Sequence, residues 1–486
     1  MKFNPKLVTS IIALLLLINS FFMLLPIPFS FYYGQDDWQD LLASSCITFL
    51  VGIVLWISSR KSIEDHELHK RDGYLVVTLG WVFISLFGSF PYMVSGTIPN
   101  LSSAFFETIS GYSTTGASVL TDIEAVPKGI LLWRSMTQWI GGMGIIVLTV
   151  AILPVLGIGG MQLFVAEAPG ISPDKLKPRI ADTAKRLWII YVGLTAVEVV
   201  LLMFGGMTFY DALNHSLTTM SSGGFSTKNN SVAYFSSPYI QYVIIVFMFL
   251  AGTNFTITYF ALKGKFRKIW ENDEFRYYLF AVSLFSLMIA LTVYLVTPLG
   301  VERSFRDSLF QVVSIVTTTG FVTADYTSWT SFATACFFIL MFFGASAGST
   351  AGGVKIVRHI ILLKNSFLEL KRQLHPSAII PVRLNKRAVT KDVTYNILAF
   401  IMIYILIFAI GSILMALIGV DFDTAIGSVA TCLGNIGPGI GKVGPVDNFA
   451  GIPQIGKWLL SFLMLLGRLE LFTVLILFSP YYWKRI

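Results

Sequence analysis

The chain has 486 residues, of which 55% are hydrophobic and only 13% are charged, and its formal net charge is +8. This composition excludes a soluble globular protein of this size. Apolar runs of about twenty residues recur from end to end, and each is long enough to cross the hydrocarbon core of a bilayer. We therefore predict an all-α integral membrane protein.

In chain order the apolar runs predict ten transmembrane helices, near residues 7–28, 40–58, 73–92, 130–153, 188–206, 239–262, 276–297, 332–362, 393–419 and 456–482. The first run is too long for a signal-peptide core and no small-residue cleavage site follows it, so we expect it to remain as a span. The three cysteines are scattered and indicate neither a disulfide framework nor a metal site. No span contains paired carboxylates or a nucleophile–base motif, so we do not expect an enzyme.

The charged residues predict the topology. Most lysines and arginines fall on alternate loops and at the ends, namely the N-terminus, 59–72, 163–187, 263–276, 355–392 and the C-terminus. By the positive-inside rule these loops and both termini are cytoplasmic. The opposite loops are rich in aspartate and glutamate, which would concentrate cations at an outer mouth.

A polar pattern that ends at a glycine occurs four times, each time between two spans on the outer side. The four segments are AFFETISGYSTTG (104–116), ALNHSLTTMSSGG (212–224), SLFQVVSIVTTTG (308–320) and AIGSVATCLGNIG (425–437). Each begins with a stretch of helical character that is too short to span and then changes to small or hydroxyl residues. We predict a span–reentrant loop–span unit that is used four times in the same orientation.

The repeat predicts five parts of the chain. They are an N-terminal two-span unit (1–72) and pore repeats at 73–187, 188–274, 275–392 and 393–486. Irregular backbone is tolerated at membrane depth only where it is buried in protein or lines a watery cavity. Four reentrant loops satisfy this condition together if they converge on one pseudo-four-fold pore axis.

A ring of peptide oxygens on such an axis can replace the water shell of an alkali cation. Glycine allows the backbone angles that this requires, and nearby hydroxyls can brace the strand or add a ligand. The alternative is that the segments are polar kinks in ordinary helices, and the four copies in register argue against it. The predicted ion ligands are Thr114, Thr115, Gly116, Ser222, Gly223, Gly224, Thr318, Thr319, Gly320, Asn435, Ile436 and Gly437. The fourth loop lacks the threonine-rich pattern, which leaves open whether its side chains or only its backbone coordinate.

The segment MFFGASAGSTAGGVKIVRH (341–359) interrupts the second span of the third repeat. Its small residues make a poor helix interior. They are Gly344, Ser346, Gly348, Ser349, Thr350, Gly352 and Gly353. Close helix packing is one explanation; we favour a flexible gate loop that crosses the pore below the filter.

Arg468 lies near the middle of the last predicted span, where a charge costs roughly 3 kcal/mol or more unless it faces the interior of the bundle. One possibility is that Glu198, another charge inside a span, is its structural partner. The other is that Arg468 points into the pore, repels cations and contacts carbonyl groups of the 344–353 loop. The sequence leaves both possibilities open.

The filter motifs resemble those of a known family. STTGAS (113–118), SSGGFST (221–227), TTTGFVT (317–323) and GNIGPG (434–439) are similar to the filter sequences of the Trk/Ktr/HKT superfamily of potassium transporters, most closely its bacterial TrkH-type pore subunits. The resemblance implies that Gly116, Gly224, Gly320 and Gly437 line the filter. Glycine rather than serine at the first position implies that the transported ion is K⁺, with Rb⁺ tolerated. It also implies that an arginine at the position of Arg468 lies beside the gate loop.

The same resemblance implies a homodimer in the bacterial inner membrane and a cytosolic TrkA-type nucleotide-binding regulatory subunit. The basic stretch 364–392 either anchors the topology beside anionic membrane lipid or docks that regulatory partner. No nucleic-acid partner and no cofactor besides K⁺ are expected. The alternative function is a secondary transporter that couples K⁺ influx to proton or sodium movement.

Overall fold

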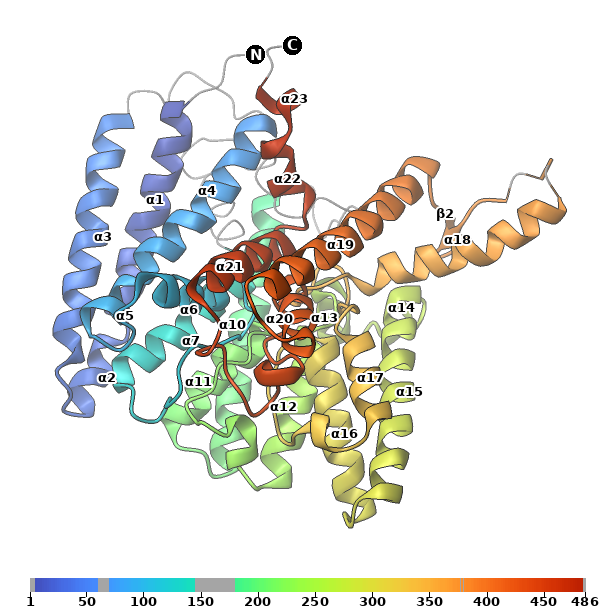
Figure 1. Cartoon of the computed structure of the whole chain (residues 1–486), viewed down its shortest axis with the longest axis horizontal. Helices are drawn as coiled ribbons and strands as arrows, with labels where there is room; N and C mark the ends of the chain where they lie inside the picture. The colour runs from blue at the N-terminus through green and yellow to red at the C-terminus, as the bar shows by residue number, and fades with distance from the viewer. Residues whose placement is uncertain (1–4, 60–69, 145–179, 376, 379, 484–486) are drawn as a thin grey trace.

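The structure is a computed structural model that describes residues 5–59, 70–144, 180–375, 377–378 and 380–483. This part of the chain is helical except for its loops and a short hairpin, β1 (Arg383–Leu384) with β2 (Arg387–Ala388). Figure 1 shows the helices side by side, with the start of α1 and the end of α23 on the same side of the molecule. This arrangement fits the predicted all-α membrane protein.

The N-terminal unit consists of two long antiparallel helices at one edge of the molecule (Figure 1). They are α1 (Pro5–Leu24), which continues into α2 (Ile27–Tyr32), and α3 (Asp37–Ser59). The hydroxyl group of Ser45 donates a hydrogen bond to the main-chain oxygen of Ser20 at 2.8 Å and ties the two helices together.

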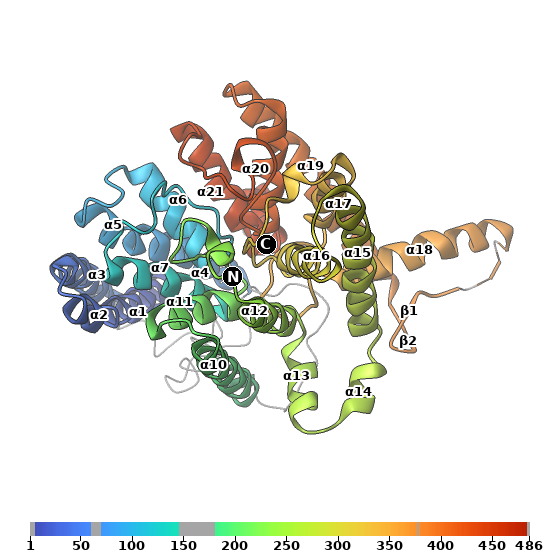
Figure 2. The ribbon, with the colours of Figure 1, turned by 90° about the horizontal axis from the view of Figure 1, so that it is seen from below.

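Four further units follow, each with a long helix, a short helix and a second helix. The first contains α4 (Lys70–Gly88), α5 (Phe90–Val94), α6 (Leu101–Tyr112) and α7 (Lys128–Gly142). The second contains α10 (Ile180–Phe204), α11 (Phe209–Met220), η2 (Ser231–Tyr234), α12 (Pro238–Ala251), α13 (Phe255–Leu262) and α14 (Phe266–Trp270). The third contains α15 (Asp273–Val296), α16 (Val301–Val316), η3 (Tyr326–Ser328), α17 (Ser331–Leu340) and α18 (Ile356–Leu374). The fourth contains α19 (Lys391–Leu417), α20 (Phe422–Gly434), η4 (Gly441–Val443), α21 (Gln454–Arg468), α22 (Phe472–Phe478) and α23 (Pro480–Trp483). Figure 2 shows the four units arranged around a common centre.

Of the short helices α6, α11, α16 and α20, three begin at a capping side chain, whereas α16 begins after Gly300 without one. The side chains of Asn100, Thr208 and Asp421 accept hydrogen bonds from main-chain N–H groups in the first turns of α6, α11 and α20. A helix of 12 residues, the length of α6 and α11, rises only about 18 Å and cannot cross a bilayer. All four short helices have 16 residues or fewer, and each is followed by a non-helical segment, as the predicted reentrant loops require.

The second helix of three units is broken, and two of the breaks fall inside the predicted spans 239–262 and 456–482. Helix α12 meets α13 at 113°, and α21 meets α22 at 118°. The first break follows Gly252, where Asn254 caps the new helix α13 by accepting a hydrogen bond from Thr256 N at 2.8 Å. The second break follows Arg468, where Glu470 and Leu471 both have positive φ. Local caps and left-handed residues override the continuous hydropathy there.

In the part of the chain that the structure describes, six helices are long and apolar enough to span a membrane, or eight if each sharply bent pair counts as one span. The predicted span 332–362 is divided into α17 and α18 by the loop 341–355. The predicted span 130–153 runs past residue 144 and so extends beyond the described residues. Ten spans therefore stay a prediction.

Candidate selectivity filter and gate

The four polar segments adopt the same backbone conformation after their short helices. In each, a non-glycine residue in the left-handed region precedes a left-handed glycine by two positions. The φ values of the first set are 55° for Thr114, 58° for Ser222, 54° for Thr318 and 53° for Asn435. Those of the second set are 81° for Gly116, 75° for Gly224, 80° for Gly320 and 105° for Gly437. The fourth loop shares this geometry although its sequence differs.

The four loops meet in a closed ring. Each filter glycine packs against a main-chain oxygen of the next loop. This oxygen belongs to the residue just before the filter glycine of that loop. A Cβ built on the packed glycine would lie less than 3.0 Å from the oxygen. The pairs are Gly116 with Gly223, Gly224 with Thr319, Gly320 with Ile436, and Gly437 with Thr115. The order runs from loop 1 through loops 2, 3 and 4 and back to loop 1. The ring brings together all twelve residues that the sequence predicts as ion ligands.

Solvent reaches the ring at its glycines. Gly116, Gly224 and Gly320 are partly exposed, whereas the two residues before each of them are buried. An accessible main chain at three of the four glycines is the arrangement expected around a narrow opening. Glycine is required here for two reasons, because its φ is positive and because the neighbouring loop leaves no room for a Cβ.

Hydroxyl groups brace the loops from within. Ser113 Oγ and Thr115 Oγ1 are 2.7 Å apart in the first loop, and Thr317 Oγ1 and Thr319 Oγ1 are 2.8 Å apart in the third. In the third loop Ser314 Oγ also donates to the main-chain oxygen of Phe321 at 2.7 Å. These hydrogen bonds fix the strands that carry the filter glycines.

Arg468 lies at the base of the ring. Its Nη1 donates to Thr114 Oγ1 at 3.1 Å and to the main-chain oxygen of Thr350 at 2.9 Å. Its Nη2 donates to the main-chain oxygens of Gly141 at 2.5 Å and Gly142 at 3.1 Å. The contact with Thr350 is the one that the pore-facing possibility predicted.

The alternative partner, Glu198, is not bonded to Arg468. Both carboxylate oxygens of Glu198 are buried and form no hydrogen bond to the described residues. Glu470, two residues after the arginine, instead forms an ion pair with Arg358 at the start of α18.

The loop 341–355, which contains the predicted gate loop 344–353, runs directly beneath the ring. Gly352 N donates to Thr318 Oγ1 at 2.7 Å, and Thr350 Oγ1 lies 2.9 Å from Ser222 Oγ. A Cβ built on Gly352 would lie 2.7 Å from Cβ of Asn435. Thus three of the four left-handed filter residues adjoin the gate loop, and the fourth, Thr114, is bonded to Arg468.

Second-repeat residues hold the gate loop in place. Ser346 N donates to the main-chain oxygen of Gly252 at 3.0 Å, and Phe255 N donates to that of Gly348 at 3.1 Å. The loop therefore docks into the break between α12 and α13. Three predicted gate residues shape the loop itself: Ser349 Oγ bonds to Ser346 O at 2.6 Å, and Gly348 and Gly353 have positive φ.

Close packing explains the glycine at position 344. A Cβ on Gly344 would lie 2.7 Å from the main-chain oxygens of both Gly352 and Val354, so the beginning and the end of the gate loop are in contact there. The structure thus places Arg468 at the base of the ring and the seven small residues of the predicted gate segment in the loop beneath it.

Sequence reasoning missed a set of polar residues behind the ring. Glu107 and Arg134 form a buried ion pair with Nε and Oε1 2.7 Å apart, and Oε2 of Glu107 accepts a hydrogen bond from Val119 N at 2.8 Å. A signal existed, because Glu107 lies nine residues before its filter glycine and the other three segments also carry a polar residue there. Those residues are His215, Gln311 and Ser428.

Comparison with known proteins identifies the family. The model of the TrkH family, described as cation transport protein, matches residues 38–485. This chain belongs to the TrkH family. Members of this family are transport proteins rather than enzymes by their names, and the multi-pass helical fold of this chain agrees with that description.

The chain is similar to named TrkH-family proteins over its whole length. It is 40% identical over 483 residues to "Trk system potassium uptake protein TrkH" of Salmonella typhimurium, covering 98% of this chain and 99% of that protein. It is 34% identical to "Trk system potassium uptake protein TrkG" of Escherichia coli, with 99% of each chain covered. The crystal structure of the potassium transporter TrkH from Vibrio parahaemolyticus matches with a TM-score of 0.89 and 36% identity, over 99% of this chain and 100% of that one.

Proposed function

We propose that this protein takes up K⁺ across the bacterial inner membrane through a filter formed by its four reentrant loops, with Rb⁺ tolerated. The closed ring supports the proposal most strongly, because each filter glycine packs against a main-chain oxygen of the next loop. Peptide oxygens in such a ring can replace the hydration shell of a K⁺ ion. The names of its relatives as potassium uptake proteins point to the same ion.

The outer face supplies negative charge to this filter. Hydrogen bonds from Thr424 and Lys442 lower the pKa of Asp421 to about 2. A hydrogen bond from Asn229 lowers the pKa of Asp122. Both carboxylates are therefore ionised at neutral pH. The charge of Asp421 is balanced by its ion pair with Lys442 at 3.1 Å, so Asp122 is the one of the two that raises the local concentration of cations at the mouth.

The conformation described here is closed in our proposal. Arg468 places a positive charge at the base of the ring, and the gate loop lies beneath it, so a cation leaving the filter meets both. Conduction requires Arg468 and the gate loop to move apart from the ring. The hydrogen bond between Arg468 and Thr350 is the contact that must break first.

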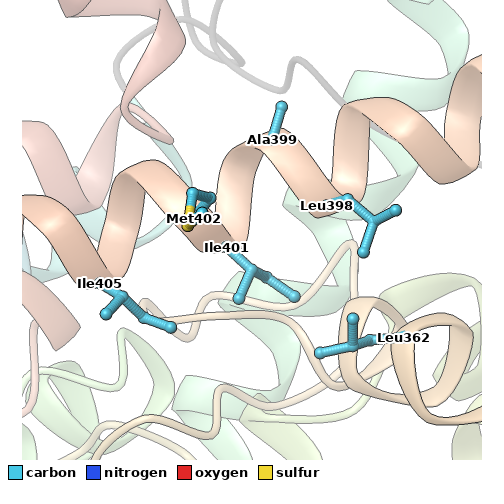
Figure 3. A pocket seen from close by; sticks show the side chains of 6 residues that line it. All are labelled: Leu362, Leu398, Ala399, Ile401, Met402 and Ile405. Atoms are coloured by element: carbon cyan, nitrogen blue, oxygen red, sulfur yellow. The ribbon is translucent and has the colours of Figure 1, made fainter. Parts of the chain in front are cut away.

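The third repeat offers a surface for partners. Helix α18 and the β1–β2 hairpin project from the body of the molecule (Figures 1 and 2). A cavity of about 440 Å³ opens between α18 and α19. Figure 3 shows its apolar lining, formed by Leu362, Leu398, Ala399, Ile401, Met402 and Ile405. We propose that a second copy of the chain covers this face in a homodimer within the lipid, and that a cytosolic TrkA-type nucleotide-binding subunit docks on the basic stretch 364–392.

A coupled transporter is the second candidate function. The buried Glu198 favours it, because a carboxyl group without a hydrogen-bond partner among the described residues can carry a proton through a cycle. The common orientation of the four loops and their shared ring favour the pore instead, since rocking transporters commonly use inverted halves.

Rubidium flux into proteoliposomes that hold the purified chain separates the two functions. A pore predicts flux down the Rb⁺ gradient, weak competition by Na⁺ and no dependence on an imposed proton gradient beyond its effect on membrane voltage. Uptake against the Rb⁺ gradient that is driven by protons or sodium would support the coupled transporter. Absence of Rb⁺ flux under all of these conditions would contradict both.

A further inference from the structure

The second filter loop lacks a side chain where two other loops carry a hydroxyl group. The residue before the filter glycine is Thr115 in the first loop and Thr319 in the third, but it is Gly223 in the second. The hydroxyls of Thr115 and Thr319 bond to Ser113 and Thr317 and so brace their own loops. A glycine cannot provide this brace.

The amide group of Gln138 fills the space that a side chain at position 223 would occupy. Gln138 belongs to α7 of the first repeat and is completely buried. A Cβ built on Gly223 would overlap Cδ, Oε1 and Nε2 of this amide. Nε2 donates to the main-chain oxygen of Gly223 at 2.6 Å, and Oε1 accepts from Phe225 N at 3.0 Å. The amide is therefore hydrogen-bonded to the main chain on both sides of Gly224.

The counterpart of this glutamine in the second repeat is a methionine. The equivalent position can be found from a glycine that packs against the filter loop. Gly142 packs against Ser221. Gly142 lies four residues after the glutamine, and Ser221 lies three residues before the second filter glycine. Gly252 packs in the same way against Thr317, three residues before the third filter glycine. Four residues before Gly252 the chain carries Met248.

The counterpart in the fourth repeat is also a methionine. Gly141, three residues after the glutamine, packs against the main-chain oxygen of Tyr112, four residues before the first filter glycine. Gly467 packs likewise against the main-chain oxygen of Leu433, four residues before the fourth filter glycine. Three residues before Gly467 the chain carries Met464. Gln138 thus belongs to the second loop, in which the residue before the filter glycine is Gly223. The methionines stand at the equivalent positions for the third and first loops, in which that residue is Thr319 or Thr115.

We infer that Gln138 is a positioning residue of the filter, whose amide replaces the side chain that Gly223 lacks. This inference rests on the proposed function as a cation-selective pore. A buried amide that satisfies one C=O and one N–H holds both in a fixed direction, and its loss leaves two buried main-chain groups unpaired. The oxygens of the second loop would then no longer keep the spacing that distinguishes K⁺ from Na⁺.

Arg134, one turn before Gln138 on α7, extends the same support. Its Nη1 donates to the main-chain oxygen of Ser226 at 3.1 Å, and its guanidinium lies 3.4 Å from the ring centroid of Phe225. The second loop keeps one hydroxyl brace of its own, from Thr218 Oγ1 to the main-chain oxygen of Phe225 at 2.8 Å. At Gly223, where the first and third loops carry a bracing threonine, it is held instead by a side chain from the first repeat.

The test is a double-mutant cycle that transplants the chemistry of the third loop into the second. Gln138→Met removes the amide, and we expect the Rb⁺-over-Na⁺ flux ratio to fall by roughly tenfold, as for the loss of a buried hydrogen bond. Gly223→Thr alone should also lower the ratio, because the new side chain collides with the amide. The double variant Gln138→Met with Gly223→Thr should recover a ratio close to that of the wild type.

A matched control uses Gln241, another buried glutamine, whose amide bonds to Phe235 O and Arg306. Gln241→Met should leave the flux ratio unchanged. If Gln138→Met in a folded, membrane-inserted protein keeps the wild-type ratio, the inference is overturned while the proposed function stands. If that single variant does not fold, the double variant decides: a selective double variant supports the brace, and a non-selective one overturns it. A wild type that shows no Rb⁺ flux would overturn the proposed function itself.

Discussion

Arg468 Nη1 is 2.9 Å from the main-chain oxygen of Thr350 and 3.1 Å from Thr114 Oγ1. One guanidinium therefore joins helix α21 of the fourth repeat to the gate loop of the third repeat and to the filter loop of the first. Hydrogen bonds to several main-chain and hydroxyl oxygens replace the water molecules that would otherwise surround this side chain. A charge inside a membrane protein is usually accommodated in this way. In the proposed mechanism, its place below the ring makes it the central element of the closed state.

Replacing Arg468 by alanine should raise ion flux. The substitution removes the positive charge at the base of the ring and the hydrogen bonds that hold the gate loop, so we expect roughly a tenfold increase in Rb⁺ flux. Arg303→Ala, which changes an exposed arginine on the short helix of repeat 3, is the control and should leave flux unchanged. Equal or lower flux for Arg468→Ala, with normal membrane insertion, would argue that the arginine is not part of a gate.

Replacing Gly116 by serine should loosen discrimination between K⁺ and Na⁺. A Cβ at this position collides with the main-chain oxygen of Gly223, so the first and second loops must separate. Gly34→Ser is a matched control, because Gly34 also has a positive φ of 63° but has nothing within 4 Å of a built Cβ. Competition of Na⁺ with Rb⁺ uptake measures the effect, and an unaltered selectivity would remove Gly116 from the filter mechanism.

Replacing Gly352 by alanine should push the gate loop away from the ring. The new Cβ would lie 2.7 Å from Cβ of Asn435 and 3.0 Å from the main-chain oxygen of Gly434, both of which belong to the fourth filter loop. We expect higher flux with unchanged selectivity, because the filter loops keep their mutual contacts. A variant with wild-type flux would show that this contact does not hold the gate closed.

Breaking the ion pair between Arg358 and Glu470 should destabilise the protein. Both side chains are largely buried, and the pair links the start of α18 to the break between α21 and α22. Removing one partner of a buried pair costs about 3–5 kcal/mol. Glu470→Gln should therefore lower the melting temperature in detergent, and Arg358→Met combined with Glu470→Gln should lower it by less than the sum of the single changes. Additive losses would mean that the two residues act independently.

The sequence predicted the convergence of the four loops better than the breaks in the helices around them. The filter loops could be found because hydroxyl and glycine residues recur at fixed spacing in segments where lipid exposure of polar backbone is forbidden. The bends after Gly252 and Arg468 were missed because apolar residues continue on both sides, so hydropathy carries no signal of a turn. Only the glycine-rich run at 341–355 was polar enough to be recognised as a break.

Most contacts between repeats were beyond the reach of the sequence. The amide of Gln138 meets Gly223 across 85 positions of the chain, and neither residue has a local pattern that names the other. The contact of Arg468 with Thr350 across 118 positions was predicted only as one of two open possibilities. Only the closure of the four loops into one ring brings these residues together, and that closure depends on the packing of all four units.

The most direct test of the central claim is to locate the ion. Crystals of the protein grown with Rb⁺ and measured at the rubidium absorption edge should show an anomalous peak on the axis of the ring, bounded by the main chain at Gly116, Gly224, Gly320 and Gly437. Replacing Rb⁺ by Na⁺ should remove the peak. Bound Rb⁺ elsewhere in the protein, with none inside the ring, would contradict the claim that these four loops together coordinate the transported ion.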